Sequence, residues 1–243
     1  MSNPLRFGII IPARFASTRF PGKPLQDLGG KTLIERVVDA AKLANPQAGI
    51  AVATDDIRIA EHLADKCRVL MTKNTHPSGT DRCAEAFEQL QWDCDVVVNL
   101  QGDEPFIQAD QVALLLSAFE DSNIDIATLK IAIKDSEDIA DPNIVKVVCD
   151  KNDKALYFSR ASIPFKRSIT NEVQHFRHIG MYAFRCTALQ NIASLKPSML
   201  EITELLEQLR WLENGLSIGV KETHWASPAI DTPEDLAKAL KFL

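Results

Sequence analysis

The stretch "RFGIIIPARFASTRFPGKPL", residues 6–25, joins a short apolar run to a segment that carries Arg14, Arg19 and Lys23. The apolar run at residues 6–12 predicts a strand that is buried on both faces. Pro12 at its start, with Pro21 and Pro24, excludes a regular helix in the following segment, because proline lacks a backbone N–H and clashes with the preceding turn. The three cations therefore lie on a stiff loop directly after the first strand.

The first half of the chain alternates between apolar runs and amphipathic segments. The expected strands lie at residues 6–12, 49–54, 67–71 and 95–100. The expected helices lie at residues 31–44, 56–65 and 80–90. This alternation, with strands that are continuous apolar runs, is typical of an α/β fold whose parallel sheet is covered by helices on both faces.

The second half has shorter strand-like runs and fewer clear helices. The expected strands lie at residues 124–133, 144–150, 154–160, 176–185 and 215–220. One amphipathic helix is expected over residues 199–215, and a last helix over residues 232–243 with Thr232 as its N-cap. No linker or repeat divides the sequence, so we expect one domain over residues 1–243 with an insert at roughly 134–215.

Composition restricts the class of function. Of the 243 residues, 46% are hydrophobic, and 33 acidic residues exceed 27 basic ones, which gives a net charge of −6. This acidic balance argues against nucleic acid as a partner. No apolar run approaches the roughly 20 residues that span a bilayer, which argues against a membrane partner. Five cysteines without a CxxC pair indicate reduced thiols in a cytoplasmic protein and no structural zinc site.

Four polar segments follow the expected strands of the first half, at the edge where an open parallel sheet binds its ligands. They are the loop after residue 12, "ATDD" at 53–56, "HPSGTDR" at 76–82 and "NLQGDEP" at 99–105. We expect them to converge. The first loop is a poor Walker motif, because Gly22-Lys23 is followed by proline. Its fixed cations nevertheless suit a polyphosphate, and a solvated loop is the alternative.

Two aspartates are candidate ligands of a magnesium ion. Asp103 follows a buried strand, and Asp231 precedes the last helix. Proteins bind Mg²⁺ through one or two carboxylates, together with water and substrate phosphates, and both side chains fit that role. Each aspartate also has a simpler interpretation, because acidic residues stabilise helix N-termini.

Seven sequence blocks, in order, resemble the signature blocks of the 3-deoxy-manno-octulosonate cytidylyltransferases, also called CMP-Kdo synthetases. The blocks are "IPARFASTRFPGKPL", "HPSGTDR", "VVNLQGDEP", "ALYFSRASIPF", "FRHIGMYAFR", "LEQLRWLENG" and "IDTPEDL". They span almost the whole chain, and those of the sugar-acid half are the most specific. The resemblance implies a three-layer Rossmann-like nucleotidyltransferase fold. Its mostly parallel central sheet would be joined by a smaller inserted sheet that serves dimerisation.

The resemblance also implies an enzyme, a magnesium-dependent cytidylyltransferase. CTP and the eight-carbon sugar acid Kdo would give CMP-Kdo and pyrophosphate for lipopolysaccharide biosynthesis, in a cytoplasmic homodimer. The residues implied for the nucleotide are Ala13, Arg14, Arg19, Lys23, Ser78, Gly79, Thr80 and Gln101. Lys23, Arg14, Asp103 and Asp231 would be the catalytic residues, with the two aspartates as metal ligands.

The same resemblance implies a set of residues for the sugar acid. They are Gln101, Arg160, His178, Tyr182, Glu207 and Gln208. Arginine suits a carboxylate, and the other side chains suit hydroxyl groups. Without the resemblance, His178 is interpreted as a structural histidine and Tyr182 as a core aromatic residue. Glu207 and Gln208 would then be ordinary polar residues on the surface of a helix.

Two departures from the family pattern concern the identity of the sugar. Met199 replaces the proline of the usual Ser-Pro-Leu-Glu block. The segment before the second metal ligand, usually rich in glycine, is "HWASPAID" at residues 224–231. These departures raise the hypothesis that the substrate is the 8-amino analogue of Kdo, in which an amine replaces one terminal hydroxyl.

Three other functions compete with this interpretation. A glycosyltransferase that uses a nucleotide sugar would place a DxD motif after a strand, whereas Asp93 and Asp95 precede the strand at residues 95–100. A non-catalytic nucleotide-binding regulator would be expected to lack Lys23 or Asp103, and both are present. Transfer of CMP to a different sugar acid is the third alternative.

Overall fold

The computed structural model describes residues 5–16, 20–44, 46–168, 172–226, 228 and 230–243. The chain forms two compact units. Unit 1 comprises Met1–Ala113, Phe184–Ala193 and Ser227–Leu243, and unit 2 comprises Leu114–Ala183 and Ser194–Ala226. Three separate parts of the chain therefore build unit 1. The expected single domain over residues 1–243 with an insert at roughly 134–215 stays a prediction.

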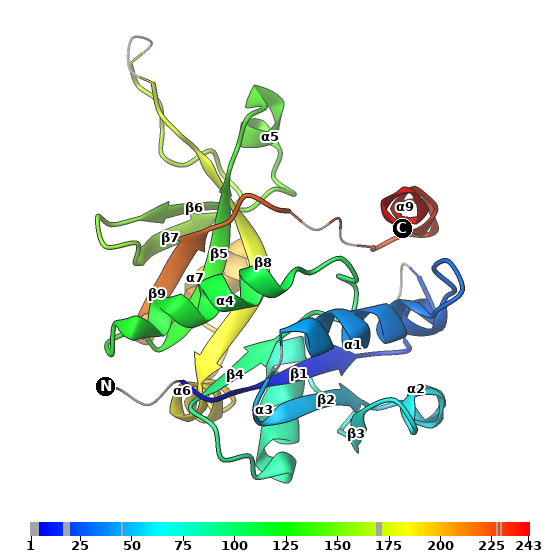
Figure 1. The fold of residues 1–243 in the computed structure, drawn as a ribbon. Coiled ribbons are helices and arrows are strands. Elements are labelled where there is room, and N and C mark those ends of the chain that lie inside the picture. Colours follow the sequence, from blue (N-terminus) through cyan, green and yellow to red (C-terminus); the bar gives the residue numbers. More distant parts are fainter. Residues whose placement is uncertain (1–4, 17–19, 45, 169–171, 227, 229) are drawn as a thin grey trace. The chain divides into compact units, whose positions relative to one another are not determined.

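Unit 1 contains a parallel sheet (Figure 1). Its strands are β1 (Phe7–Ala13), β2 (Gly49–Thr54), β3 (Arg68–Met71) and β4 (Val96–Asn99), in the spatial order β3-β2-β1-β4. β1 and β4 are buried along their whole length, as expected for strands covered on both faces. β2 and β4 pair with opposite edges of β1, so the strand order reverses there. The predicted α/β fold with a mostly parallel sheet is confirmed.

Helices cover both faces of this sheet, with α1 and α3 on opposite sides in Figure 1. The helices of unit 1 are α1 (Leu33–Leu43), α2 (Ile57–Leu63), α3 (Gly79–Leu90), α6 (Cys186–Ile192) and α9 (Pro233–Ala239). The short 3-10 helices η1 (Lys23–Leu25) and η3 (Leu240–Phe242) also belong to it. α4 (Ala109–Ser117) begins in unit 1 and ends in unit 2. No helix in the described part of the chain is long and apolar enough to cross a membrane.

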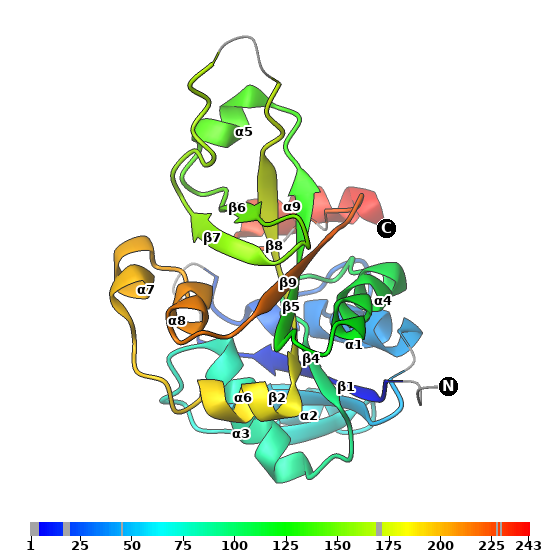
Figure 2. The same ribbon diagram turned by 90° about the vertical axis from the view of Figure 1, so that its left-hand side faces the viewer.

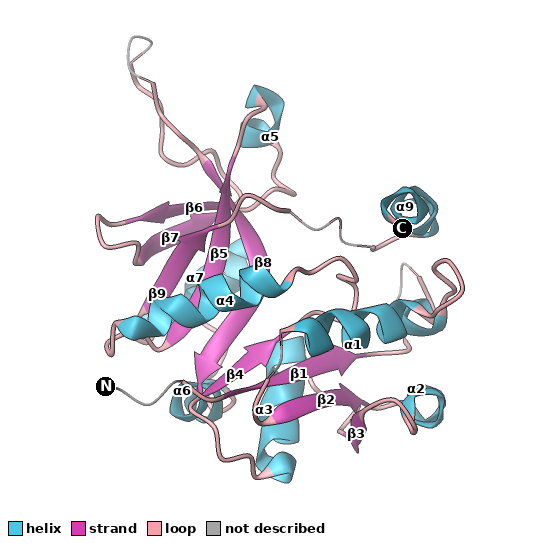
Figure 3. Ribbon diagram, viewed as in Figure 1, coloured by secondary structure: helices cyan, strands magenta, loops and turns pink. Residues whose placement is uncertain are grey.

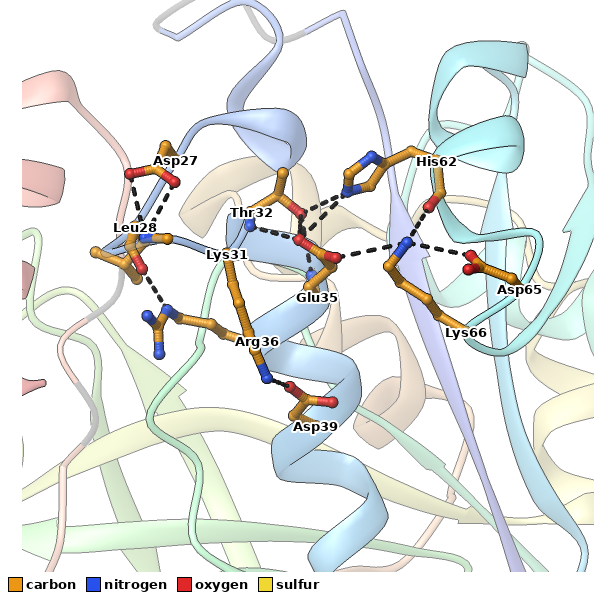
Figure 4. Close-up of polar contacts among 11 residues, drawn as sticks. Asp27, Leu28, Lys31, Thr32, Glu35, Arg36, Asp39, His62, Asp65 and Lys66 are labelled. Carbon is orange, nitrogen blue, oxygen red and sulfur yellow. Dashed lines mark hydrogen bonds and ion pairs between the residues drawn. The ribbon is translucent and has the colours of Figure 1, made fainter.

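The first turn of α1 is fixed by a capping box, shown in Figure 4. Thr32 Oγ1 accepts a hydrogen bond from the Glu35 N–H, and the Glu35 carboxylate accepts one from the Thr32 N–H at 2.7 Å. His62 Nε2 and Lys66 Nζ lie 3.4 and 3.6 Å from the same carboxylate. Glu35 therefore caps its own helix and also joins α1 to the segment that contains α2.

Replacing Glu35 with glutamine is expected to lower the free energy of unfolding by about 1–2 kcal/mol near neutral pH. Burial raises the pKa of Glu35, but hydrogen bonds from Thr32 and His62 outweigh it and lower the pKa to about 2. Because this value lies below the ordinary 4.5, the stabilisation is present above pH 4.5 and is lost as the pH falls towards 2. Urea unfolding near neutral pH and in acid measures the difference.

The control for this variant is Glu61→Gln, which changes an exposed glutamate on α2. We expect the Glu35 effect to shrink in acid and the Glu61 effect to be small throughout. An equal pH dependence for the two variants would contradict a specific role of the capping carboxylate.

Unit 2 contains a second group of strands (Figure 2). β5 (Ile126–Ala132) pairs in parallel with β9 (Ile218–Glu222) and neighbours β8 (Phe176–Arg185), whose last two residues belong to unit 1. β6 (Lys146–Cys149) pairs antiparallel with β7 (Ala155–Ser159) and with β8. The short helices of this unit are α5 (Ser136–Ala140), α7 (Met199–Glu204), α8 (Gln208–Glu213) and the 3-10 helix η2 (Ala118–Glu120). Figure 3 labels α5 and α7 among them.

The prediction of one helix over residues 199–215 is wrong, because α7 and α8 are separate helices that contact each other (Figure 2). Leu205 ends α7 with φ 53, a left-handed conformation that is uncommon for a residue other than glycine. Arg160 donates from Nε and Nη2 to the carbonyl oxygens of Glu204 and Leu205, at 2.7 and 3.4 Å. A side chain distant in the sequence therefore supplies hydrogen bonds to the carbonyl groups at the end of α7. A local amphipathic pattern does not reveal such a contact.

Candidate functional site

A cavity of about 350 Å³ lies beyond the carboxyl ends of β1 and β4. The strand order reverses between these strands, and open α/β sheets bind their ligands in the crevice at such a point. The lining residues are Pro12, Ala13, Arg14, Ala16, Lys23, Pro24, Gly79, Arg82, Gln101, Gly102, Asp103 and Asp231. They come from the end of β1 and the segment after it, which includes η1, from the first turn of α3, from the loop after β4 and from the segment before α9. The structure thus brings together most of the residues implied for the nucleotide and the metal.

The loop after β1 is held in a defined turn. The Gly22 N–H donates to the Phe15 carbonyl at 3.0 Å. Gly22 has φ +69, and a Cβ there would lie 3.0 Å from the Phe15 ring, so both the conformation and the close approach favour glycine. The Arg58 guanidinium stacks on the same ring, 3.3 Å from its centroid. Arg14 is exposed in this loop, and Arg19 lies outside the described residues.

Lys23 bridges two carboxylates in the cavity. Its Nζ lies 2.9 Å from Asp103 Oδ2 and 3.3 Å from Asp231 Oδ1, and only 13% of the lysine side chain is exposed. The Ile230 N–H donates to the Asp103 carbonyl at 3.0 Å, which fixes the C-terminal segment beside the loop after β4. Thr232 caps α9 as predicted, by accepting a hydrogen bond from the Asp235 N–H. The two predicted metal ligands therefore converge on one ammonium group.

The two aspartates fit a magnesium ion that shares its coordination with a substrate. Both carboxylates reach one cationic atom, so both can present oxygen ligands to one ion. Within the described ranges, no group of three or more His, Cys, Asp and Glu side chains could hold a metal. Two carboxylates are nevertheless sufficient for magnesium when water and phosphate oxygens complete the coordination.

The loop after β4 approaches β1 so closely that only glycine fits at position 102. A Cβ on Gly102 would lie 2.8 Å from the Pro12 carbonyl oxygen. Gln101 Nε2 donates to Asn99 Oδ1 at 3.3 Å, which orients the glutamine side chain. This close contact keeps Gln101 and Asp103 on the cavity wall that β1 also forms.

The segment "HPSGTDR" contributes mainly through the start of α3. Ser78 is the N-cap of α3, where its hydroxyl accepts a hydrogen bond from the Asp81 N–H at 3.1 Å. Thr80 is buried in the first turn. Gly79 lines the cavity, whereas Ser78 and Thr80, the other two residues of this segment implied for the nucleotide, do not.

Arg82 is a residue of this site that the sequence did not single out. It is fully buried, its Nη1 donates to Thr72 Oγ1 at 2.6 Å, and its Nη2 lies 3.3 Å from Asp55 Oδ2. It therefore connects the segments that follow β2 and β3 to the first turn of α3. The sequence contains both partners of this ion pair, the arginine of "HPSGTDR" and an acid of "ATDD". Only the fold brings the two segments together.

The acidic pair Asp93 and Asp95 lies before β4, at the end of the strand away from the cavity. Arg6 Nη2 forms an ion pair with Asp93 at 2.5 Å, and the Arg6 N–H donates to Asp95 at 2.8 Å. Neither aspartate lines the cavity. This pair therefore does not lie where the DxD motif of a glycosyltransferase would lie, which is after the strand.

His178 lies in an aromatic cluster of unit 2. Its Nε2 is 2.9 Å from Thr128 Oγ1, and its ring centroid is 5.0 Å from that of Phe158 and 5.4 Å from that of Tyr182. Removal from water, with a smaller effect of Arg177, lowers the pKa of His178 to about 3. Burial raises the pKa of Tyr182. Both side chains are therefore neutral near pH 7 and can serve as hydrogen-bonding groups rather than as charges.

Arg160 is held in place by contacts that the sequence did not reveal. Besides its bonds to the end of α7, its Nη1 donates to the Pro142 carbonyl at 2.9 Å. The Glu204 carboxylate accepts hydrogen bonds from the Arg160 N–H at 2.9 Å and from Ser159 Oγ at 2.5 Å. Lys146 Nζ donates to the Arg160 carbonyl at 2.6 Å. Glu204 therefore binds the backbone N–H of Arg160, and Lys146 binds its carbonyl oxygen. Together they fix the backbone at this residue.

Glu207 and Gln208 lie at the start of α8. Gln208 is the first residue of the helix and is buried, whereas Glu207 is its N-cap residue and is half-buried. They belong to the same unit as Arg160, His178 and Tyr182. Apart from Gln101, the residues implied for the sugar acid therefore all lie in unit 2.

The sequence matches the cytidylyltransferase family model over residues 8–218. A 3-deoxy-manno-octulosonate cytidylyltransferase from Parabacteroides distasonis is 47% identical over 249 residues, which cover 98% of each chain. Another, from Xylella fastidiosa strain Temecula1, is 49% identical over 249 residues, again with 98% of each chain covered. A solved structure of CMP:2-keto-3-deoxy-manno-octonic acid synthetase complexed with CTP is 40% identical, with 98% of each chain covered and a TM-score of 0.92. The chain therefore belongs to the 3-deoxy-manno-octulosonate cytidylyltransferase family.

Proposed function

We propose that the protein transfers CMP from CTP to 3-deoxy-manno-octulosonate (Kdo) and releases pyrophosphate. The observation that carries this proposal is the convergence of Lys23, Asp103 and Asp231 in one cavity at the reversal of strand order. Cations on a defined loop suit a triphosphate, and paired carboxylates suit the metal that accompanies it. Membership of the family supports the sugar acid as the acceptor.

The transfer needs positioning and charge neutralisation more than covalent participation of the protein. The anomeric hydroxyl of the sugar acid would attack the α-phosphorus of CTP, and the bond to the pyrophosphate leaving group would break. Arg14 and Lys23 would hold the phosphates and reduce the repulsion between two anionic reactants. Backbone groups near Ala13 and Gly79 would hold the cytosine, and Gln101 would contact the nucleotide or the sugar.

Asp103 and Asp231 would hold the magnesium ion. When bound, the ion neutralises phosphate charge and orients the triphosphate for displacement. The Lys23 ammonium balances one of the two negative charges, which allows the carboxylates to lie close together. Lys23 would thus serve both the metal ligands and the phosphates.

The sugar acid would be bound by residues of unit 2. Arg160 has five N–H donors, and three of them are directed at backbone carbonyls. The two that remain on its Nη atoms would bind the sugar carboxylate. His178 and Tyr182, as neutral groups, would bind hydroxyls, and so would Glu207 and Gln208.

Replacing Glu204 with glutamine is expected to raise the KM for the sugar acid about tenfold and to leave the KM for CTP unchanged. The carboxylate accepts two hydrogen bonds that position Arg160 and Ser159, and an amide presents one oxygen in place of two. Initial rates at varied concentrations of each substrate measure both KM values. Glu213→Gln is the control, because Glu213 accepts a backbone hydrogen bond from Leu200 on the same pair of helices. A parallel rise of both KM values would instead indicate a general loss of structure.

The proposed reaction is tested by incubating the purified protein with CTP, Kdo and Mg²⁺. We expect release of pyrophosphate that requires both substrates, and a CMP-sugar detected by mass spectrometry. Release with another sugar acid but not with Kdo would establish the alternative acceptor. Transfer from a nucleotide sugar without pyrophosphate release would overturn the proposal.

The choice between Kdo and its 8-amino analogue concerns the segment at residues 224–231. The Trp225 N–H donates to Thr223 Oγ1 at 3.2 Å, and Ile230 is tied to Asp103 as described above. The relatives reported above carry the name of the ordinary sugar. A comparison of kcat/KM for the two sugars decides the question. A clear preference for Kdo would exclude the 8-amino hypothesis.

We also propose a cytoplasmic homodimer that serves lipopolysaccharide biosynthesis. Three apolar side chains on α7 and at its end support a subunit contact, because Met199, Ile202 and Leu205 are 73%, 62% and 76% exposed. Light scattering tests the assembly. A measured mass near the 27.0 kDa of one chain would contradict the dimer.

A further inference from the structure

Two thiols of unit 1 lie next to each other, far apart in the sequence and away from the cavity. Cys94 directly precedes Asp95 and β4, and Cys186 is the first residue of α6. Their sulfur atoms are 3.7 Å apart, although 92 positions separate the residues. Both side chains are half-buried, so a small reagent can reach them.

The backbone holds this pair of thiols together. The Cys186 N–H donates to the Asp95 carbonyl at 3.1 Å, and Cys186 Sγ donates to the Cys94 carbonyl at 3.1 Å. α6 and β4 also pack against each other. A disulfide needs an S–S distance of about 2.05 Å, which rotation of two short side chains supplies when their backbones are already adjacent.

The two thiols differ in reactivity. The contact between the two thiols lowers the pKa of Cys94 and raises the pKa of Cys186. Burial instead raises the pKa of Cys67 to about 11 and raises the pKa of Cys149. Because the thiolate is the nucleophile, Cys94 is favoured to react first with an oxidant and Cys186 to react second.

We propose that Cys94 and Cys186 form an oxidation site that a peroxide converts into an intramolecular disulfide. The Cys94 thiolate attacks one oxygen of hydrogen peroxide, the O–O bond breaks and hydroxide leaves, which gives a sulfenic acid. Cys186 then attacks the Cys94 sulfur, the S–O bond breaks and water leaves. The two sulfurs together lose two electrons, which the two peroxide oxygens gain.

The position of the pair determines what the disulfide does. Cys94 precedes the amino end of β4, whereas Gln101 and Asp103 follow its carboxyl end and line the cavity. The bond would therefore leave the candidate active site chemically unchanged. It would close a loop that contains most of unit 2, and cross-links that close long loops restrict the unfolded chain most. The expected consequence is a more stable protein with its activity retained.

The test treats the full-length reduced protein with hydrogen peroxide, blocks remaining thiols with N-ethylmaleimide and maps peptides without reduction. We expect a linked peptide pair that contains Cys94 and Cys186 and lacks two hydrogen masses. Cys94→Ser should abolish it, and the control Cys149→Ser should retain it. Alkylation of Cys94 and Cys186 to the same extent as Cys67 after peroxide treatment would overturn the proposal, and so would overoxidation of Cys94 without a link.

A second measurement does not depend on any variant. The oxidised wild-type protein should unfold at a Tm roughly 5 °C or more above the reduced protein, and dithiothreitol should reverse this shift. Cys186→Ala provides the matched protein that cannot form the bond, and its Tm should not rise with peroxide. An equal rise in that variant would show that another modification is responsible and would overturn the assignment.

Discussion

Replacing Lys23 with alanine is expected to lower kcat by about 10²–10³-fold, because the variant loses the cation that we propose stabilises the developing phosphate charge. The ammonium is the group on which Asp103 and Asp231 converge, so its loss also leaves two carboxylates close together without their cation. Pyrophosphate release at saturating CTP and Kdo measures kcat. Circular dichroism checks that the fold is retained.

The control for Lys23 is Lys31→Ala. Lys31 follows the same loop, is exposed and pairs with Asp39 at 2.6 Å, and it does not line the cavity near β1 and β4. We expect this control to keep nearly full turnover. Near-normal turnover of Lys23→Ala would remove the lysine from the phosphate-binding role.

Replacing Asp103 with asparagine is expected to lower kcat about 10²-fold or more and to raise the Mg²⁺ concentration needed for half-maximal rate. The amide keeps the size of the side chain and removes the charge that a metal ligand needs. Titration of Mg²⁺ at fixed CTP gives the rate dependence. Calorimetric titration of the protein with CTP and Mg²⁺, without Kdo, gives a readout that is independent of turnover.

Asp110→Asn is the control for this variant, because Asp110 is an exposed acid in the first turn of α4. Asp231→Asn should behave like Asp103→Asn if the two carboxylates share one ion. A variant of Asp103 with low turnover but unchanged Mg²⁺ dependence would show that Asp103 acts only as the partner of Lys23.

The sequence was sufficient to predict the elements whose pattern is local. The apolar runs gave β1, β2, β3 and β4, and Thr232 was recognisable as a cap because capping depends on the next three residues. It was also predictable that Asp103 would lie close to the loop after β1, because the carboxyl ends of parallel strands lie at the same edge of the sheet. Asp231 was already a candidate ligand of the same metal from its place before a capped helix, and the family resemblance favoured that role over simple capping.

Features that depend on distant contacts were not predictable from the pattern. Leu205 breaks an amphipathic run that contains no glycine or proline at that point, because Arg160 binds the freed carbonyls. Arg82 is inside the molecule because Thr72 and Asp55 come to it from other segments. Glu204 and Lys146 likewise position Arg160 through contacts that connect separate parts of unit 2.

The way in which unit 1 is assembled from three parts of the chain has a consequence during protein synthesis. The last part, Ser227–Leu243, leaves the ribosome after all of unit 2 and carries Asp231. It also brings Ile230 and Ala239 to the apolar cluster that includes Leu33. A nascent chain that already contains Lys23 therefore lacks both the second carboxylate and part of a core. Premature termination before this segment would give a polypeptide with all of the described strands but without an intact candidate active site.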